Sequence, residues 1–186
     1  FLLTDVIMWQ FEFKILSIDG GGIKGLYAAK LLAQIENKTG KPIGDYFDMI
    51  VGTSTGGLLA LGITLGIPCK EIARFYEENG TLIFPYGNYF QRCYKCLCQF
   101  FWGTKYNNLQ LTTAVKNLMT DYKTMSDANH FMCIPAFNLT KGRPSVFKKP
   151  FGKYHRDGRF KMMDVALATS AAPTFLPAVT IEGDQF

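Results

Sequence analysis

Histidine is scarce in this sequence, with only His130 and His155 among 186 residues. Any histidine-dependent chemistry must therefore use one of these two side chains. The sequence also has no run of 18 uncharged apolar residues, so it predicts no transmembrane helix. The apolar stretch 1–7 is short and has no basic segment before it, so it does not predict an export signal. From these absences we expect a cytoplasmic protein.

Cysteines are few and do not form an even set. The chain has five, three of them crowded at Cys93, Cys96 and Cys98. An odd, clustered set is not typical of a secreted disulfide framework, and three thiols without a fourth nearby ligand do not make a closed zinc site. We expect neither a metal nor another cofactor.

Acidic side chains are missing from one long stretch of the chain, between Glu78 and Asp121. Residues 79–161 carry 13 basic and 3 acidic side chains, and we call this segment the basic block. Such a segment attracts phosphate on lipid headgroups or nucleic acid, or else forms a solvated basic face. No signature of a nucleic-acid-binding motif accompanies it, so we do not expect nucleic acid as a partner.

Aromatic residues are abundant within the basic block, with nine between Phe84 and Tyr106. Several of them fall on one face of a helical projection, and bases lie elsewhere on it. This pattern predicts either an interfacial helix in peripheral contact with a membrane or a lid packed on the domain. The oligomeric state is not indicated by the sequence.

The order of apolar segments indicates an α/β fold of a single domain. Two strand–turn–helix units in succession favour a parallel sheet. The expected strands are 13–18, 49–51, 131–137 and 145–147. Five helices are expected: one from about residue 28 to a stop at Gly40, one at 58–65, one from Pro68 to a stop at Gly80, one that includes 111–119, and one at 162–170.

A serine lies between a predicted strand and a predicted helix, in the segment Gly52-Thr53-Ser54-Thr55-Gly56. This G-x-S-x-G pattern in a strand–turn–helix context is typical of a nucleophile elbow, in which small residues let a strained serine stand clear. A glycine-rich turn without catalytic function is the alternative interpretation.

A second glycine-rich turn, Asp19-Gly20-Gly21-Gly22-Ile23-Lys24-Gly25, also follows a strand and opens a helix. Successive backbone N–H groups at a helix start form an anion-binding concavity. A dinucleotide site is not favoured, because the second strand does not end in the acidic residue that such a site requires. Asp19 itself is expected to hold the turn.

Together these motifs resemble the patatin-like phospholipases. The D-G-G-G-x-[KR]-G loop matches at Gly20 to Gly25, the elbow matches at Gly52 to Gly56, and Ala168 to Phe175 resembles the segment before the family's catalytic aspartate. The resemblance implies a three-layer α/β/α sandwich with a central, mostly parallel sheet. It assigns residues 13–186 to this domain and leaves residues 1–12 as an N-terminal extension.

The resemblance also implies a lipid acyl hydrolase with a serine–aspartate dyad. Ser54 would be the nucleophile, and the N–H groups of Gly20, Gly21 and Gly22 would form the oxyanion hole. The family's aspartate lies in a D-G-[GA] motif after the segment ending at Phe175, and this chain has no such motif there. Asp157 precedes that segment and Asp184 is followed by glutamine. We therefore expect the domain to be incomplete at its C-terminus and the aspartate to lie beyond residue 186.

Two further functions stay open at this point. The domain is a catalytically silent lipid-binding or regulatory module if Ser54 is unreactive. It is an ordinary Ser-His-Asp esterase if His130 or His155 serves Ser54.

Overall fold

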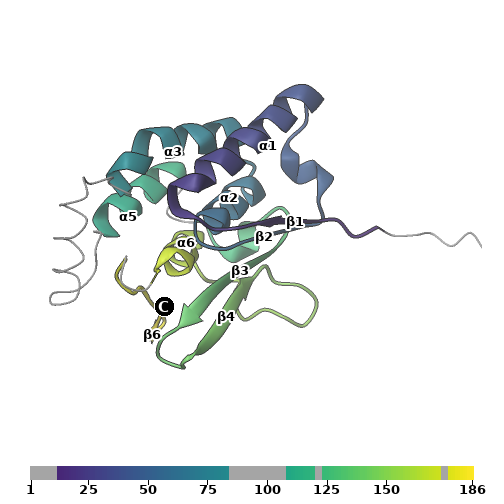
Figure 1. Ribbon diagram of the computed structural model, residues 1–186. Helices are drawn as coiled ribbons and strands as arrows, with labels where there is room; N and C mark the ends of the chain where they lie inside the picture. Colours follow the sequence, from purple (N-terminus) through teal and green to yellow (C-terminus); the bar gives the residue numbers. More distant parts are fainter. Residues whose placement is uncertain (1–11, 84–107, 120–122, 173–175) are drawn as a thin grey trace, which may run out of the picture.

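The computed structural model describes residues 12–83, 108–119, 123–172 and 176–186 (Figure 1). The main sheet has the strand order β1-β2-β3-β4, and a separate two-stranded hairpin follows later in the chain. The strands are β1 (Ile15–Ile18), β2 (Met49–Gly52), β3 (Phe131–Asn138), β4 (Arg143–Lys148), β5 (Thr180–Ile181) and β6 (Asp184–Gln185). Strands β1, β2 and β3 are parallel, and β4 is antiparallel to β3. The predicted α/β class with a mostly parallel sheet is confirmed.

Helices pack against this sheet in two tiers. They are α1 (Gly25–Thr39), α2 (Thr55–Thr64), α3 (Cys69–Ile83), α5 (Asn108–Leu118) and α6 (Met162–Ser170). Helix α2 contacts β2, and α6 contacts β3. Helices α1, α3 and α5 pack around these two, as Figure 1 shows. All ten residues of α2 are buried, as expected for a helix that is apolar on almost every side.

The two faces of the sheet differ sharply in exposure. The register pairs Ile50 with Met132, so these fully buried side chains share a face. The opposite face carries Ile15, which is 53% exposed, and Phe137, which is 50% exposed. The hydrophobic core of the described residues therefore lies between the first face and the helices.

Two glycines predicted to end helices behave differently. Gly40 does end α1, in the left-handed conformation at φ 68°, and its N–H donates to the carbonyl oxygen of Glu36. The prediction that a helix stops at Gly80 is wrong, because α3 continues to Ile83. A Cβ on Gly80 would lie only 2.1 Å from Cδ1 of Ile23. Gly80 therefore marks the close approach of Ile23 to α3 rather than a helix end.

None of the helices in the described ranges combines the length and the hydropathy needed to cross a bilayer.

Candidate functional site

Ser54 occupies a sharp turn between β2, which ends at Gly52, and α2, which begins at Thr55. Its backbone has φ 56° and ψ −123°, and φ is positive at only one other non-glycine position among the described residues. Such backbone strain costs about 1–3 kcal/mol and persists only where the surroundings hold it. The Ser54 side chain is half-buried, and its hydroxyl makes no hydrogen bond with any described residue.

Glycines at both ends of the turn allow this geometry by permitting close backbone contact. A Cβ on Gly52 would lie 2.1 Å from the carbonyl oxygen of Gly56. A Cβ on Gly56 would lie 2.1 Å from the carbonyl oxygen of Ile18, at the end of β1. The elbow is therefore folded tightly on itself and against the neighbouring strand, and any side chain at either glycine would push the turn open.

The glycine loop that follows β1 lies directly beside Ser54. A Cβ on Gly20 would be 3.0 Å from Cβ of Ser54 and 2.7 Å from the carbonyl oxygen of Thr53. A Cβ on Gly25 would be 3.0 Å from Cβ of Thr55. The two motifs, 34 residues apart, are thus brought together because β1 and β2 are parallel neighbours whose carboxyl ends share one edge of the sheet.

The three amides predicted to form an oxyanion hole are not equivalent. The N–H of Gly21 donates to Oγ1 of Thr55 at 3.2 Å. The N–H groups of Gly20 and Gly22 donate to no described residue. In this conformation, the N–H groups of Gly20 and Gly22 are free of described partners, and Gly20 lies beside Ser54, whereas Gly21 holds the loop onto the first turn of α2. The contribution of these amides to an oxyanion hole stays a prediction.

Thr169 holds the backbone of Ser54 in place through a hydrogen bond. The sequence did not predict this role for Thr169. Its Oγ1 accepts the N–H of Ser54 at 3.0 Å and donates to the carbonyl oxygen of Pro135 at 2.6 Å. Strand β2 pairs with β3 only as far as Cys133, so Pro135 lies beyond the end of that ladder. Thr169 thus satisfies a backbone acceptor on β3 and a backbone donor at the elbow with one hydroxyl.

Helix α3 supports the elbow through a buried tyrosine. The hydroxyl of Tyr76 donates to the carbonyl oxygen of Thr55 at 2.9 Å. Burial raises the pKa of Tyr76 well above its usual value, so the phenol stays protonated and remains a donor. The first turn of α2 is therefore tied both to the glycine loop and to α3.

The role of Thr169 predicts a difference between two substitutions. Thr169→Val keeps the methyl group that lies against Gly57 but removes the hydroxyl, and should destabilise the fold by about 1–3 kcal/mol because two partly buried backbone groups lose their partner. Thr169→Ser keeps the hydroxyl and should cost about 1 kcal/mol for one lost methyl. Urea unfolding of both variants measures this order.

A positioning role also predicts a kinetic difference. Thr169→Val should lower kcat about tenfold with little change in KM, because the serine loses its alignment, and Thr169→Ser should restore kcat. Equal losses of kcat in the two variants would show that the packing of the Thr169 side chain, and not its hydroxyl, determines the rate.

Neither histidine lies at the edge of the sheet that carries Ser54. His130 directly precedes β3, which is parallel to β2, so it lies at the edge opposite the elbow. His155 follows β4, which runs antiparallel and ends near the start of β3. This placement argues against the Ser-His-Asp alternative.

Two of the aspartates that the sequence offers near the family's motif, Asp157 and Asp184, are held by other side chains. Asp157 is completely buried and accepts hydrogen bonds from the Lys148 backbone, the Tyr154 hydroxyl and the Arg156 guanidinium. Asp184 accepts hydrogen bonds from Lys141 and Asn138, which lower its pKa. Asp19 is exposed and directly precedes the glycine loop. No general base for Ser54 is therefore assigned among the described residues.

Two sequence-based interpretations fall on parts of the chain that are not described. The aromatic segment Phe84 to Tyr106 lies within residues 84–107, outside the described ranges. The cysteine cluster at Cys93, Cys96 and Cys98 belongs to the same segment. In the ranges that are described, no group of three or more potential ligands is arranged to hold a metal ion.

Similarity to known proteins agrees with the motifs. The family model for patatin-like phospholipase matches residues 16–186. A cGAMP-activated phospholipase of Vibrio cholerae serotype O1 is 37% identical over 190 residues, which cover 94% of this chain and 52% of that protein. Patatin-like protein 2 of Arabidopsis thaliana is 37% identical over 88% of this chain and 43% of its own. The crystal structure of the type III effector protein ExoU matches 87% of this chain and 40% of its own at 14% identity and a TM-score of 0.45. The chain thus spans about half the length of these curated relatives, or slightly less.

Proposed function

The chain belongs to the patatin-like phospholipase family, and from that premise we propose that it hydrolyses acyl esters of phospholipids through an acyl intermediate on Ser54. The family implies a lipid substrate. The observation that supports the finer proposal is the close approach of Gly20, in the glycine loop, to Ser54, whose backbone has a positive φ.

The proposed reaction follows from this geometry. The hydroxyl oxygen of Ser54 attacks the ester carbonyl, and the negative charge that develops on the carbonyl oxygen is stabilised by the N–H groups of Gly20 and Gly22. The bond to the alcohol then breaks, and the lysolipid leaves with the proton that Ser54 gave up. Water cleaves the acyl-serine and releases the fatty acid. In this proposal the general base is an aspartate that lies outside the described residues.

Ser54 is well placed for such chemistry on electrostatic grounds. It stands at the N-terminus of α2, where the unpaired amides and the helix dipole favour negative charge. The positive-φ backbone directs the side chain away from the helix that follows. The helix N-terminus acts on the negatively charged intermediate rather than on the neutral resting hydroxyl, so it favours the transition state over the bound substrate.

The names of three relatives bear on regulation. Proteins of Vibrio cholerae, Pseudomonas aeruginosa and Escherichia coli that are 37%, 38% and 37% identical to this chain are each called a cGAMP-activated phospholipase. We extend this to the present chain as a proposal: its hydrolase activity increases when cGAMP is added.

Fatty-acid release from phosphatidylcholine vesicles tests both proposals. The full-length natural protein is assayed with and without cGAMP, and free fatty acid and lysolipid are measured together. Equal amounts of the two products support ester hydrolysis, and faster release with cGAMP supports activation. If neither condition releases fatty acid, the silent lipid-binding module becomes the better interpretation.

A further inference from the structure

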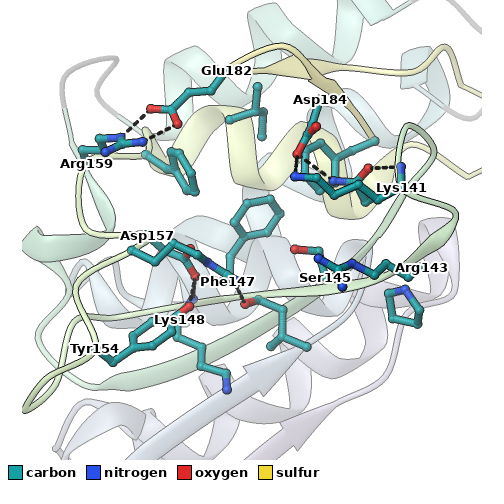
Figure 2. A pocket seen from close by; sticks show the side chains of 17 residues that line it. Lys141, Arg143, Ser145, Phe147, Lys148, Tyr154, Asp157, Arg159, Glu182 and Asp184 are labelled. Carbon is teal, nitrogen blue, oxygen red and sulfur yellow. Dashed lines mark hydrogen bonds and ion pairs between the residues drawn. The ribbon is translucent and has the colours of Figure 1, made fainter.

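A cavity lies away from Ser54, between β4 and the β5–β6 hairpin, and is drawn in Figure 2. Its volume is about 610 Å³, which is in the range of small-ligand sites. None of its lining residues belongs to the glycine loop or to the elbow. The cavity collects bases from the later part of the basic block, which the proposed hydrolytic site does not use.

The carboxylates in this cavity are already neutralised by neighbouring bases. Glu182 accepts two hydrogen bonds from Arg159, and Asp184 forms an ion pair with Lys141. Asp157 is buried and paired with Arg156. Figure 2 shows the Arg159–Glu182 and Lys141–Asp184 pairs on either side of Phe147. These pairs orient the bases at the rim of the cavity, where each keeps N–H groups that its carboxylate does not use.

Lys148 and Arg143 have no such carboxylate at ion-pair distance among the described residues, but the positive charge of Arg143 helps to lower the pKa of Asp184, so that carboxylate is close to Arg143. The guanidinium of Arg143 also forms no hydrogen bond with any described residue. The β3–β4 register places Arg143, Ser145 and Phe147 on one face of β4, and Phe147 is almost completely buried. The exposed guanidinium of Arg143 and the partly buried hydroxyl of Ser145 therefore lie on the same face of β4 as the buried ring of Phe147.

The charges on the lining residues are unbalanced. Five bases and three carboxylates line the cavity, which leaves an excess of two positive charges. In a concave site such an excess of one sign of charge raises the local potential and attracts anions. A guanidinium suits phosphate in particular, because its planar N–H groups match two phosphate oxygens.

From these observations we propose that the cavity between β4 and the β5–β6 hairpin binds a phosphate-bearing anion, with Arg143 and Ser145 as direct contacts. The paired bases Lys141 and Arg159 at the rim add positive potential, which also favours binding of an anion. The phosphate belongs either to a soluble compound or to a lipid headgroup. This inference does not depend on catalysis at Ser54, so the failure of one leaves the other standing.

Titration of the full chain with inorganic pyrophosphate, followed by calorimetry, tests the proposal. Arg143→Gln should weaken binding about tenfold or more, because it removes a charge-assisted contact. Lys38→Gln is the matched control, since it removes one positive charge from an exposed position at the end of α1. It should leave binding unchanged. Thermal unfolding of both variants checks that each is folded.

Vesicle binding separates the two sources of the phosphate. Phosphatidylcholine vesicles with and without phosphatidic acid are compared for the wild-type chain and Arg143→Gln. Arg143-dependent binding to phosphatidic acid alone identifies a headgroup site, and Arg143-dependent binding of pyrophosphate alone identifies a soluble ligand. Absence of both, or equal weakening by Arg143→Gln and Lys38→Gln, overturns the proposal.

Discussion

Replacing Ser54 with alanine is expected to reduce fatty-acid release by about 10⁴-fold or more, because no other group can carry the acyl chain. The fold should be retained. The Ser54 hydroxyl has no hydrogen-bond partner among the described residues, so its removal leaves no buried group unsatisfied. Rates are measured on phosphatidylcholine vesicles with the full-length natural protein, and circular dichroism checks the fold.

The histidines provide the control for this experiment. His130→Ala and His155→Ala should retain activity close to that of the natural protein, since both residues lie at the edge of the sheet opposite the elbow. A large loss of activity in either variant would restore the Ser-His-Asp interpretation. A Ser54→Ala variant that still released fatty acid at the natural rate would remove Ser54 from the mechanism.

Gly56→Ala is expected to be severely destabilising, by about 4 kcal/mol or more, because the added Cβ would overlap backbone atoms. The contact is with the carbonyl oxygen of Ile18 at 2.1 Å, and a second lies at 2.8 Å from the carbonyl oxygen of Asp19. Neither oxygen belongs to a flexible side chain that could move aside. Urea unfolding of the variant should show a much lower midpoint, or no folded baseline at all.

Gly142→Ala separates this steric effect from the usual conformational cost of losing a glycine. Gly142 has φ 60°, but a Cβ there would meet nothing within 4 Å. Gly142→Ala should therefore lower the free energy of unfolding by only about 1 kcal/mol, which is the cost of placing alanine in a left-handed backbone conformation. If Gly56→Ala lost no more than Gly142→Ala, the tight contact between the elbow and β1 would be contradicted.

The elements nearest the site could be predicted because their signals are local. The strand predicted at 49–51 and the helix predicted at 162–170 follow directly from apolar patterning and are confirmed, although the strand runs one residue further, to Gly52. The glycines of both motifs mark turns that the structure contains. Helix α2 begins at Thr55, three residues earlier than predicted. The elbow places Thr55 directly in the first helical turn, and a polar residue there gives no hydrophobic periodicity to detect.

The contacts that hold the elbow could not be predicted, because they join distant residues. Thr169 reaches Ser54 across 115 positions, and it does so only because α6 packs on β3 beside the end of β2. The hydrogen bond from the Gly21 N–H to Thr55 likewise forms only because folding brings the two turns together. A sequence pattern identifies glycines that supply donors, but not which of those donors the fold leaves free.

Covalent labelling with a fluorophosphonate, followed by peptide mapping, tests the central claim most directly. An activated serine attacks phosphorus and displaces fluoride, and the polarised phosphoryl oxygen of the adduct takes the place of the ester intermediate's oxyanion. We predict a single adduct on the peptide that contains Ser54 in the full-length natural protein, and none in Ser54→Ala. An unlabelled Ser54, or an adduct on a different serine, would contradict a nucleophile built from this elbow and its glycine loop.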